Sequence, residues 1–166
     1  MIMLKLRRNA GSSLVGLLVA MSIMVLVLGA ANSLFVFGVK TYQLNLDRLE
    51  VQENLRIGMD RLSREVRQAA EITSIEHSGL GRLTFKDPDG ELISYRISKS
   101  GDAEAAYQLV RSIKGSGNNP VARYVTKLDV QPANAGAGVR TVHLTITGEK
   151  GASGAMDIST SVTLRN

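Results

Sequence analysis

The chain has 166 residues, no cysteine and no tryptophan, and aromatic residues make up only 4% of it. This length suits one compact domain with an extension. Without cysteine the chain has no disulfide and no thiolate metal site, and the scarcity of aromatic side chains argues against a surface that stacks bases or sugars.

The formal net charge of +5 is concentrated at the N-terminus. Lys5, Arg7 and Arg8 precede residue 11 with no acid among them, whereas residues 40–70 and 71–166 each carry an excess of a single positive charge. A nucleic-acid surface normally shows as a basic patch on the folded domain. The nearly neutral body of this chain therefore argues against nucleic acid as a partner.

An uncharged apolar segment follows the basic residues. No charged residue occurs from Asn9 to Val39, and as a helix the stretch from Leu14 to Val39 is about 39 Å long, enough to cross a hydrocarbon core of about 30 Å. Basic residues on the N-terminal side of such a segment favour a cytoplasmic N-terminus. We therefore expect a single-pass protein whose later residues lie on the outer side of the inner membrane.

Two other interpretations of this segment stay open. A secretory signal also combines a basic start, an apolar stretch and a small-residue cleavage site, which Gly29-Ala30-Ala31 supplies. Cleavage after Ala31 would, however, leave the apolar run from Leu34 to Val39 exposed on a soluble protein, which is unfavourable. The other interpretation is an uncleaved membrane anchor without any role in assembly.

The residues from Gly11 to Val15 (GSSLV) directly follow the basic leader and open the apolar helix. This arrangement resembles the prepilin (class III) signal of type IV pilin-like proteins. The resemblance implies that prepilin peptidase cleaves between Gly11 and Ser12 and methylates Ser12, which separates a leader (1–11) from a transmembrane and assembly helix (12–39). It also places assembly contacts at Gly16 and at three leucines, Leu14, Leu17 and Leu18.

Two positions depart from the family pattern. The first mature residue is Ser12, where the family usually has Phe or Met, and the fifth is Gly16, where it usually has Glu. In the family that Glu neutralises the N-terminal ammonium of a neighbouring subunit in an apolar environment, where an unpaired charge is costly. A subunit at the tip has no upper neighbour to neutralise. The resemblance thus points to a minor or initiating subunit, unless Gly16 is simply a tolerated change.

Residues 40–70 are predicted to continue the helix as an amphipathic stem. Asp60–Arg64 and Arg61–Glu65 are opposite charges at i,i+4 on its polar side. Residues 52–69 (QENLRIGMDRLSREVRQA) resemble the stem of J-type minor pseudopilins and W-type minor pilins. Apolar residues recur at spacings of four and three along one face, which we expect to pack on a sheet: Leu55, Met59, Leu62, Val66 and Ala69.

Residues 71–166 read as short β-strands separated by turns. Strands are predicted at 71–76, 82–86, 92–98, 107–113, 121–130, 139–147 and 155–164, with loops at 114–120 and 131–138. Alternation of polar and apolar residues over 92–98 is typical of a half-buried strand. The predicted fold class is therefore α+β: a long N-terminal helix, membrane half plus amphipathic half, packed on an antiparallel β-sheet in the manner of pilins.

The sequence indicates no catalytic residue, metal site or cofactor. His77 and His143 lack metal-ligand spacing. Asp87, Asp89 and Glu91 have the alternation that suits calcium, but a short turn around Pro88 and Gly90 explains them as well. Two closely spaced glycine pairs occur in the chain, Gly115-x-Gly117 and Gly136-x-Gly138. Neither pair is predicted to open a helix after a strand, as a phosphate-binding loop would.

These observations predict a structural, non-enzymatic subunit of a type IV pilus, a type II secretion pseudopilus or a competence pseudopilus. Its expected partners are other pilin or pseudopilin subunits, prepilin peptidase, the inner-membrane assembly platform and membrane lipid. Its expected location is the inner membrane and then a periplasmic or cell-surface filament. The alternative is a single-pass membrane-anchored binding or sensing module that does not polymerise.

Overall fold

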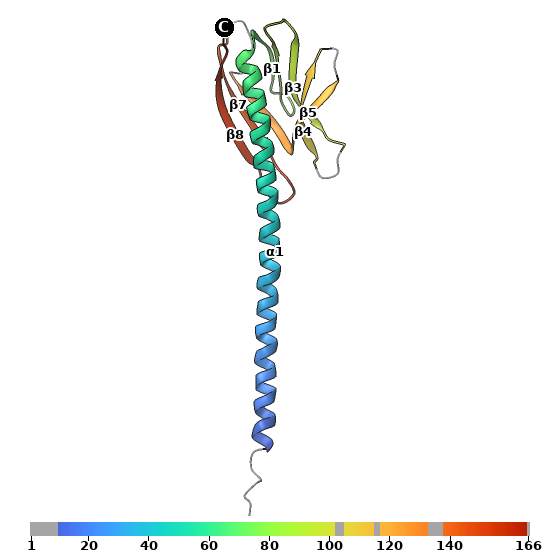
Figure 1. Cartoon of the computed structure of the whole chain (residues 1–166), viewed down its shortest axis with the longest axis vertical. Coiled ribbons are helices and arrows are strands. Elements are labelled where there is room, and N and C mark those ends of the chain that lie inside the picture. The colour runs from blue at the N-terminus through green and yellow to red at the C-terminus, as the bar shows by residue number, and fades with distance from the viewer. Residues whose placement is uncertain (1–9, 102–104, 115–116, 133–137, 166) are drawn as a thin grey trace, which may run out of the picture. The chain divides into compact units, whose positions relative to one another are not determined.

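The computed structural model describes residues 10–101, 105–114, 117–132 and 138–165, with the backbone alone for 10–13. The chain forms two units, Met1–Gln43 and Leu44–Asn166. The helix α1 (Ala10–Gln68, 59 residues) contributes to both (Figure 1). Each unit is described by itself below.

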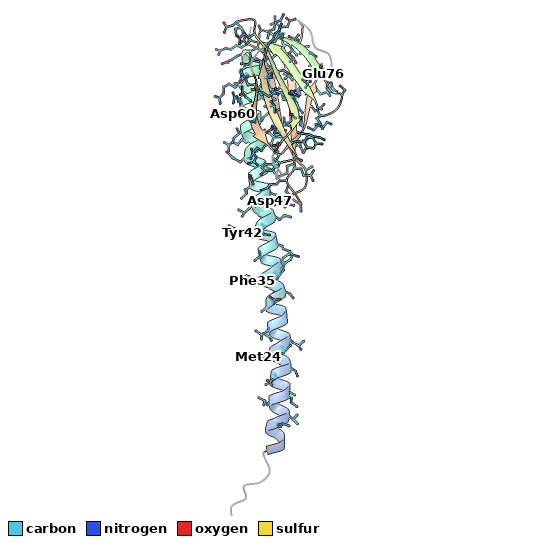
Figure 2. The ribbon with its side chains drawn as sticks, turned by 90° about the vertical axis from the view of Figure 1, so that its right-hand side faces the viewer. Met24, Phe35, Tyr42, Asp47, Asp60 and Glu76 are labelled. Carbon is cyan, nitrogen blue, oxygen red and sulfur yellow. The ribbon has the colours of Figure 1, made fainter. Side chains whose placement is uncertain are left out.

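The first unit is helical over its described part, and its side chains pack on nothing within the unit. Every described side chain from Leu14 to Gln43 is exposed. Figure 2 shows Met24, Phe35 and Tyr42 projecting from this part of α1. Ser22 and Ser33 each donate a side-chain hydrogen bond to the carbonyl four residues earlier, at 2.8 and 3.0 Å. Their hydroxyls are thus satisfied inside the helix, as an apolar surrounding requires.

In the second unit, residues 44–68 of α1 form the stem, which packs on the sheets through one face. All five residues of the predicted apolar stripe are buried, and Val51, one turn before Leu55, extends it. The predicted pair Asp60–Arg64 lies on the exposed side, whereas in the predicted pair Arg61–Glu65 only Arg61 is exposed and Glu65 is largely buried. The amphipathic packing predicted for the stem is therefore confirmed.

In the described part of the chain, eight strands form two antiparallel sheets (Figure 1). The five-stranded sheet has the order β1-β2-β3-β4-β5, and the three-stranded sheet has the order β6-β7-β8. The first sheet contains β1 (Glu71–Glu76), β2 (Arg82–Lys86), β3 (Leu92–Lys99), β4 (Tyr107–Ile113) and β5 (Asn118–Arg123). The second contains β6 (Val125–Gln131), β7 (Thr141–Gly148) and β8 (Met156–Thr163).

The predicted fold class is confirmed, but several predicted strand bounds and the prediction of a single sheet are wrong. Residues 118–120, predicted as loop, belong to β5, and the single strand predicted over 121–130 is divided at Tyr124. Tyr124 has a φ of 61°, in the left-handed region, where a strand cannot continue. The chain leaves one sheet at this residue and enters the other, so there are two sheets instead of one.

The loop between β1 and β2 joins the two sheets. The carbonyl of Leu80 accepts a hydrogen bond from the N–H of Leu128 in β6, at 2.9 Å. Gly81 has a φ of +93°, and a Cβ on it would lie 1.8 Å from the Leu128 carbonyl oxygen. Only glycine allows this approach, which lets one hydrophobic core extend under both sheets and the stem.

The carboxylate of Asp87, whose spacing also suits calcium, organises the turn between β2 and β3. Oδ1 of Asp87 accepts the backbone N–H groups of Asp89 and Glu91, at 3.0 and 2.8 Å. The N–H of Gly90, which has a φ of +84°, donates to the Asp87 carbonyl at 3.1 Å. Residues 87–91 therefore form a β-turn, in which Asp87 accepts hydrogen bonds from the backbone N–H groups of the loop.

Candidate membrane and assembly helix

The predicted processing site lies at the edge of the described residues. Gly11 and Ser12 are part of the backbone of α1, but their side chains are outside the described part. Lys5, Arg7 and Arg8 of the leader are outside it altogether. Cleavage after Gly11 and methylation of Ser12 therefore stay predictions.

The predicted assembly residues are solvent-exposed in the isolated chain. Leu14, Leu17 and Leu18 are 63, 59 and 58% exposed. A Cβ on Gly16 would meet no atom within 4 Å, so no contact within the described chain requires glycine there. The absence of an acid at this position is thus not explained by packing within the chain.

Apolar side chains cover all sides of this part of α1. Between Leu14 and Val39, seventeen large apolar side chains are each between 41 and 73% exposed. Burying one such side chain from full exposure is favourable by about 1.5–3 kcal/mol; because these side chains are only partly exposed in the helix, covering the whole set is worth on the order of 20 kcal/mol. A soluble helix is apolar on one face, whereas a helix that is apolar all round is buried, either in a membrane or in the core of a large protein. By length and composition, α1 is the one helix among the described residues that suits a membrane span.

A charged cluster attaches the start of the stem to the turn between β7 and β8. Lys150 Nζ lies 2.9 Å from Asp47 Oδ1 and 2.5 Å from Glu50 Oε2. The Tyr124 hydroxyl donates to the other Glu50 oxygen at 3.0 Å. The hydrogen bond from Lys150 holds the pKa of Glu50 below its ordinary value, and the same bond, with that to Asp47, raises the pKa of Lys150. Glu50 and Lys150 are therefore ionised at neutral pH, and they fix the turn to the helix.

Two further contacts reinforce this attachment. Arg48 Nε donates to the carbonyl of Ser153 at 3.1 Å, and Ser153 is almost completely buried. Asn54 Oδ1 accepts the backbone N–H of Arg123 at 3.0 Å, at the end of β5. The stem is therefore tied to both sheets over its first three turns by polar groups as well as by its apolar stripe.

A second ion pair lies nearer the C-terminal end of the stem. Arg111 Nε of β4 donates to Glu65 Oε2 at 2.8 Å, and both side chains are largely buried. The Tyr95 hydroxyl lies close to this pair. Burial, followed by the nearby Glu65 carboxylate, raises the pKa of Tyr95. The Tyr95 hydroxyl oxygen is buried and has no hydrogen-bond partner among the described residues. It lies near Glu65 without forming a hydrogen bond to it.

The titratable side chains of the described residues do not assemble into a recognisable reactive site. No three His, Asp or Glu side chains gather at metal-binding distance in the described part of the chain. His77 Nε2 lies 2.7 Å from the Val130 carbonyl oxygen. His143 Nδ1 lies 2.6 Å from Ser161 Oγ on the solvent side of β7 and β8, with no acid hydrogen-bonded to the ring among the described residues. The distinctive feature that the geometry provides is an apolar helix that continues into a folded domain.

The comparisons with known proteins add no relative: no family model, no curated protein and no solved structure matches the chain significantly. Sequence reasoning found the apolar helix and the stem stripe. It missed the cluster around Glu50, because Tyr124 and Lys150 are far along the chain from Asp47 and Glu50, and no spacing connects them.

Proposed function

We propose that this chain is a minor subunit of a type IV pilin-like filament, processed by prepilin peptidase and polymerised through the N-terminal part of α1. The observation that carries the proposal is the uncharged segment from Leu14 to Val39, whose large apolar side chains are exposed on every side. The same helix continues as the stem of a folded domain. A leader with three basic residues precedes the apolar segment.

One apolar segment can serve as anchor and as polymer core because both environments are dry. In the bilayer, lipid covers the side chains of the helix, and its backbone groups are paired within the helix. In a filament, neighbouring helices replace the lipid, so the segment never enters water. Exchange of lipid for protein contacts costs little hydrophobic free energy, and association then depends on packing between helices. The folded domain stays outside the membrane throughout.

Gly16 is the basis for assigning a minor role at an end of the filament. The packing of the described chain does not require glycine at this position, and a glycine cannot neutralise the ammonium of a neighbouring subunit. Such a subunit is suited to a place above which no further subunit is added. The proposal does not distinguish a pilus, a type II secretion pseudopilus and a competence pseudopilus.

The proposal is tested by mass spectrometry of the intact N-terminus after purification from native membranes. We expect a chain that begins at methylated Ser12. A chain that begins at Asn32 would indicate ordinary secretion, and an uncleaved chain would indicate a plain anchor; either result overturns the proposal. Gly11→Leu should leave the precursor uncut, whereas the matched substitution Gly16→Leu should be processed normally.

The terminal role is tested separately with Gly16→Glu. If the missing acid limits the subunit to an end of the filament, the acid should raise the ratio of this subunit to the major subunit in purified filaments several-fold. Gly16→Gln is the matched control, because it has a similar size without the charge. An unchanged ratio in Gly16→Glu would remove the terminal role while leaving the pilin-like function standing.

A further inference from the structure

The edges of the two sheets are protected to different degrees. An exposed edge strand offers unpaired backbone groups to another chain, and proteins usually guard such edges with bulges, proline or charge. At the β1 edge the pairing with β2 is shifted between Ile72 and Ser74, and the strand carries Glu71 and Glu76. At the β5 edge the register also shifts, and Pro120 lies within the strand. Both edges of the five-stranded sheet are therefore guarded.

In the three-stranded sheet one edge is covered and the other is not. The loop between β1 and β2 closes the β6 edge, because Leu80 accepts the N–H of Leu128 and His77 contacts the carbonyl of Val130. β8 forms the opposite edge (Figure 1). It pairs with β7 over eight consecutive residues without a shift, contains no proline, and has Asp157 as its one charged residue.

The free side of β8 can be assigned from two hydrogen bonds. The N–H of Leu164 donates toward β7, to the Arg140 carbonyl, at 2.8 Å, whereas the N–H of Arg165 donates to the Arg67 carbonyl of α1 at 2.9 Å. Backbone groups alternate in direction along an antiparallel strand. Odd-numbered residues therefore direct their N–H and C=O groups away from β7, and no other described residue hydrogen-bonds to the backbone of these four: Asp157, Ser159, Ser161 and Thr163.

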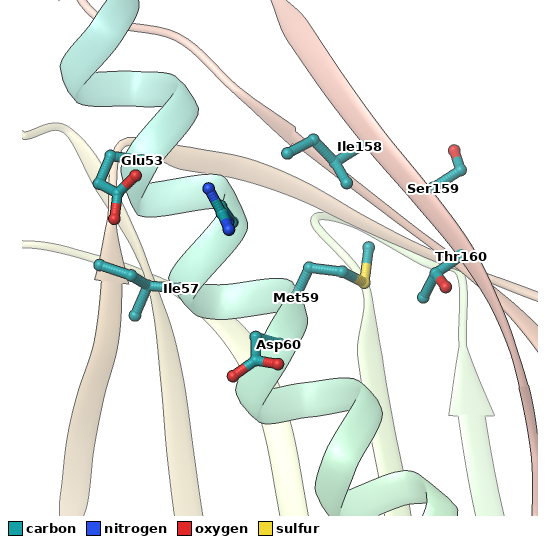
Figure 3. Close-up of a pocket in the computed structure, with 8 residues that line it drawn as sticks. Glu53, Ile57, Met59, Asp60, Ile158, Ser159 and Thr160 are labelled. Atoms are coloured by element: carbon teal, nitrogen blue, oxygen red, sulfur yellow. The ribbon is translucent and has the colours of Figure 1, made fainter.

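A groove lies beside this free edge, between β8 and the stem (Figure 3). Its volume is about 670 Å³. Met59 of the stem points toward β8 in Figure 3, and Ile158 and Thr160 line the opposite wall. Ile158 and Thr160 are only half-buried, although their side chains lie on the face of β8 that bears the core residue Val162. An added strand would cover the exposed parts of the Ile158 and Thr160 side chains at the border of the core.

The unpaired charges around the edge are of both signs, and the positive ones gather at the end of β8. Arg56 lines the groove, and Arg67 and Arg165 lie at the end of β8; all three are exposed, and none forms an ion pair with a described residue. In the groove, Arg56 is accompanied by Glu53 and by Asp60, which is paired with Arg64, and β8 itself carries Asp157. The end of β8, where Arg67 and Arg165 lie, therefore complements an acidic residue of an added segment.

A second copy of the chain does not fit this edge if both copies are anchored in one membrane. β8 begins after a turn that contacts Arg48 and ends beside Arg67, so it runs parallel to the stem. Antiparallel pairing of β8 with its copy would need a twofold axis perpendicular to the strands, which makes the stems antiparallel. Two copies inserted from the same side have parallel stems.

We propose that the free edge of β8 binds an extended segment of a different protein, which adds to the three-stranded sheet as a fourth strand. Backbone hydrogen bonds to the four edge residues provide the binding, and alternate apolar side chains of the segment enter the groove beside Met59 and Ile158. An acidic residue of the segment faces Arg67 and Arg165 at the end of β8. The choice of a different protein over a second copy rests on the proposed membrane function, whereas the strand addition itself does not.

The test uses the full chain in detergent micelles and a defined probe, the acetylated and amidated peptide Glu-Val-Thr-Val-Glu-Val-Thr. Residue-resolved hydrogen–deuterium exchange should show that the peptide slows exchange of the Ser159 and Ser161 amides at least tenfold. The amides of Ile158 and Thr160 point toward β7 and should be slow with or without the peptide. They serve as an internal control for the fold of the sheet.

Two matched comparisons separate strand addition from simple apolar adsorption. A peptide N-methylated on the amides that face β8 should bind at least tenfold more weakly, and replacement of its Glu residues by Lys should weaken binding several-fold. Ser159→Pro removes an edge N–H without removing a bond to β7, so the peptide should no longer slow exchange of the Ser161 amide. Ser159→Thr should retain the protection of Ser161. Folding of each variant is checked by the slow Thr160 amide.

Three outcomes would overturn the proposal: no protection at millimolar peptide, equal binding of the N-methylated peptide, or protection of Ser159 without peptide in a chain that dimerises in the micelle. The last would make a second copy the occupant. None of these outcomes affects cleavage after Gly11, so failure here is distinguishable from failure of the proposed function.

Discussion

Gly58 lies where the stem packs closely on the sheets, and its replacement tests this packing. A Cβ at this position would lie 3.0 Å from Ala122 Cβ, 3.3 Å from Leu109 Cδ2 and 3.6 Å from Ile146 Cδ1. Leu109 can shift its side-chain end by a few tenths of an ångström. Ala122 has no rotatable side chain, so its contact can be relieved only by moving the helix or β5.

Two opposing terms decide the effect of Gly58→Ala. Alanine is favoured over glycine in a helix interior by about 1 kcal/mol. An extra methyl group in a packed core typically costs about 1–3 kcal/mol. Because the closest contact is with the rigid Ala122, we expect the packing cost to exceed the helix gain, with a net loss of about 1 kcal/mol. Gly58→Val should lose about 3 kcal/mol or more.

The assay is urea unfolding of the full chain in mild detergent, followed by circular dichroism, with a double-mutant cycle. Ala122→Gly removes the methyl group that the added Cβ would meet, so the double variant should recover at least about 1 kcal/mol relative to additivity. If Gly58→Ala instead stabilised the protein by about 1 kcal/mol and showed no coupling to Ala122→Gly, helix propensity alone would govern the site. The close packing of the stem on β5 at this position would then be refuted.

Three further substitutions test other contacts. Gly81→Ala would place its Cβ 1.8 Å from the Leu128 carbonyl oxygen at a φ of +93°, so we expect a loss of stability above about 3 kcal/mol or no folded protein, measured by the same urea unfolding. Tyr95→Phe removes a buried hydroxyl without a hydrogen-bond partner and should stabilise the protein by about 1 kcal/mol; a loss of similar size would reveal a bond to that oxygen. The hydrogen bond from Lys150 lowers the pKa of Glu50 in the folded chain below its ordinary value of 4.5. The ionised Glu50 therefore contributes fully to stability above pH 4.5, and this contribution is lost as the pH falls through the lower pKa of the folded state. Because the Glu50 side chain is 42% exposed, we expect less than about 1 kcal/mol, seen as a smaller difference in urea midpoint between pH 7 and pH 3 in Glu50→Gln than in the unchanged chain.

Local patterns in the sequence were sufficient to predict the helix and most strands. The stem stripe from Leu55 to Ala69 follows helical spacing, and all of its residues are buried. The strands at 71–76, 82–86 and 107–113 have the predicted bounds, since turn residues and alternation mark them within a few neighbouring positions. These features depend on interactions along one segment of chain, which is why a single sequence reveals them.

Features that join distant segments were decided by the tertiary structure. The sequence alone determined an uncharged helix long enough to span a membrane, because that follows from composition. It did not show that Tyr124 turns the chain from one sheet into the other, or that Lys150 reaches Glu50, because neither depends on local spacing. The unguarded edge of β8 is likewise a property of strand order: its residues look like any other strand until the topology leaves that side of the strand without a neighbour among the described strands.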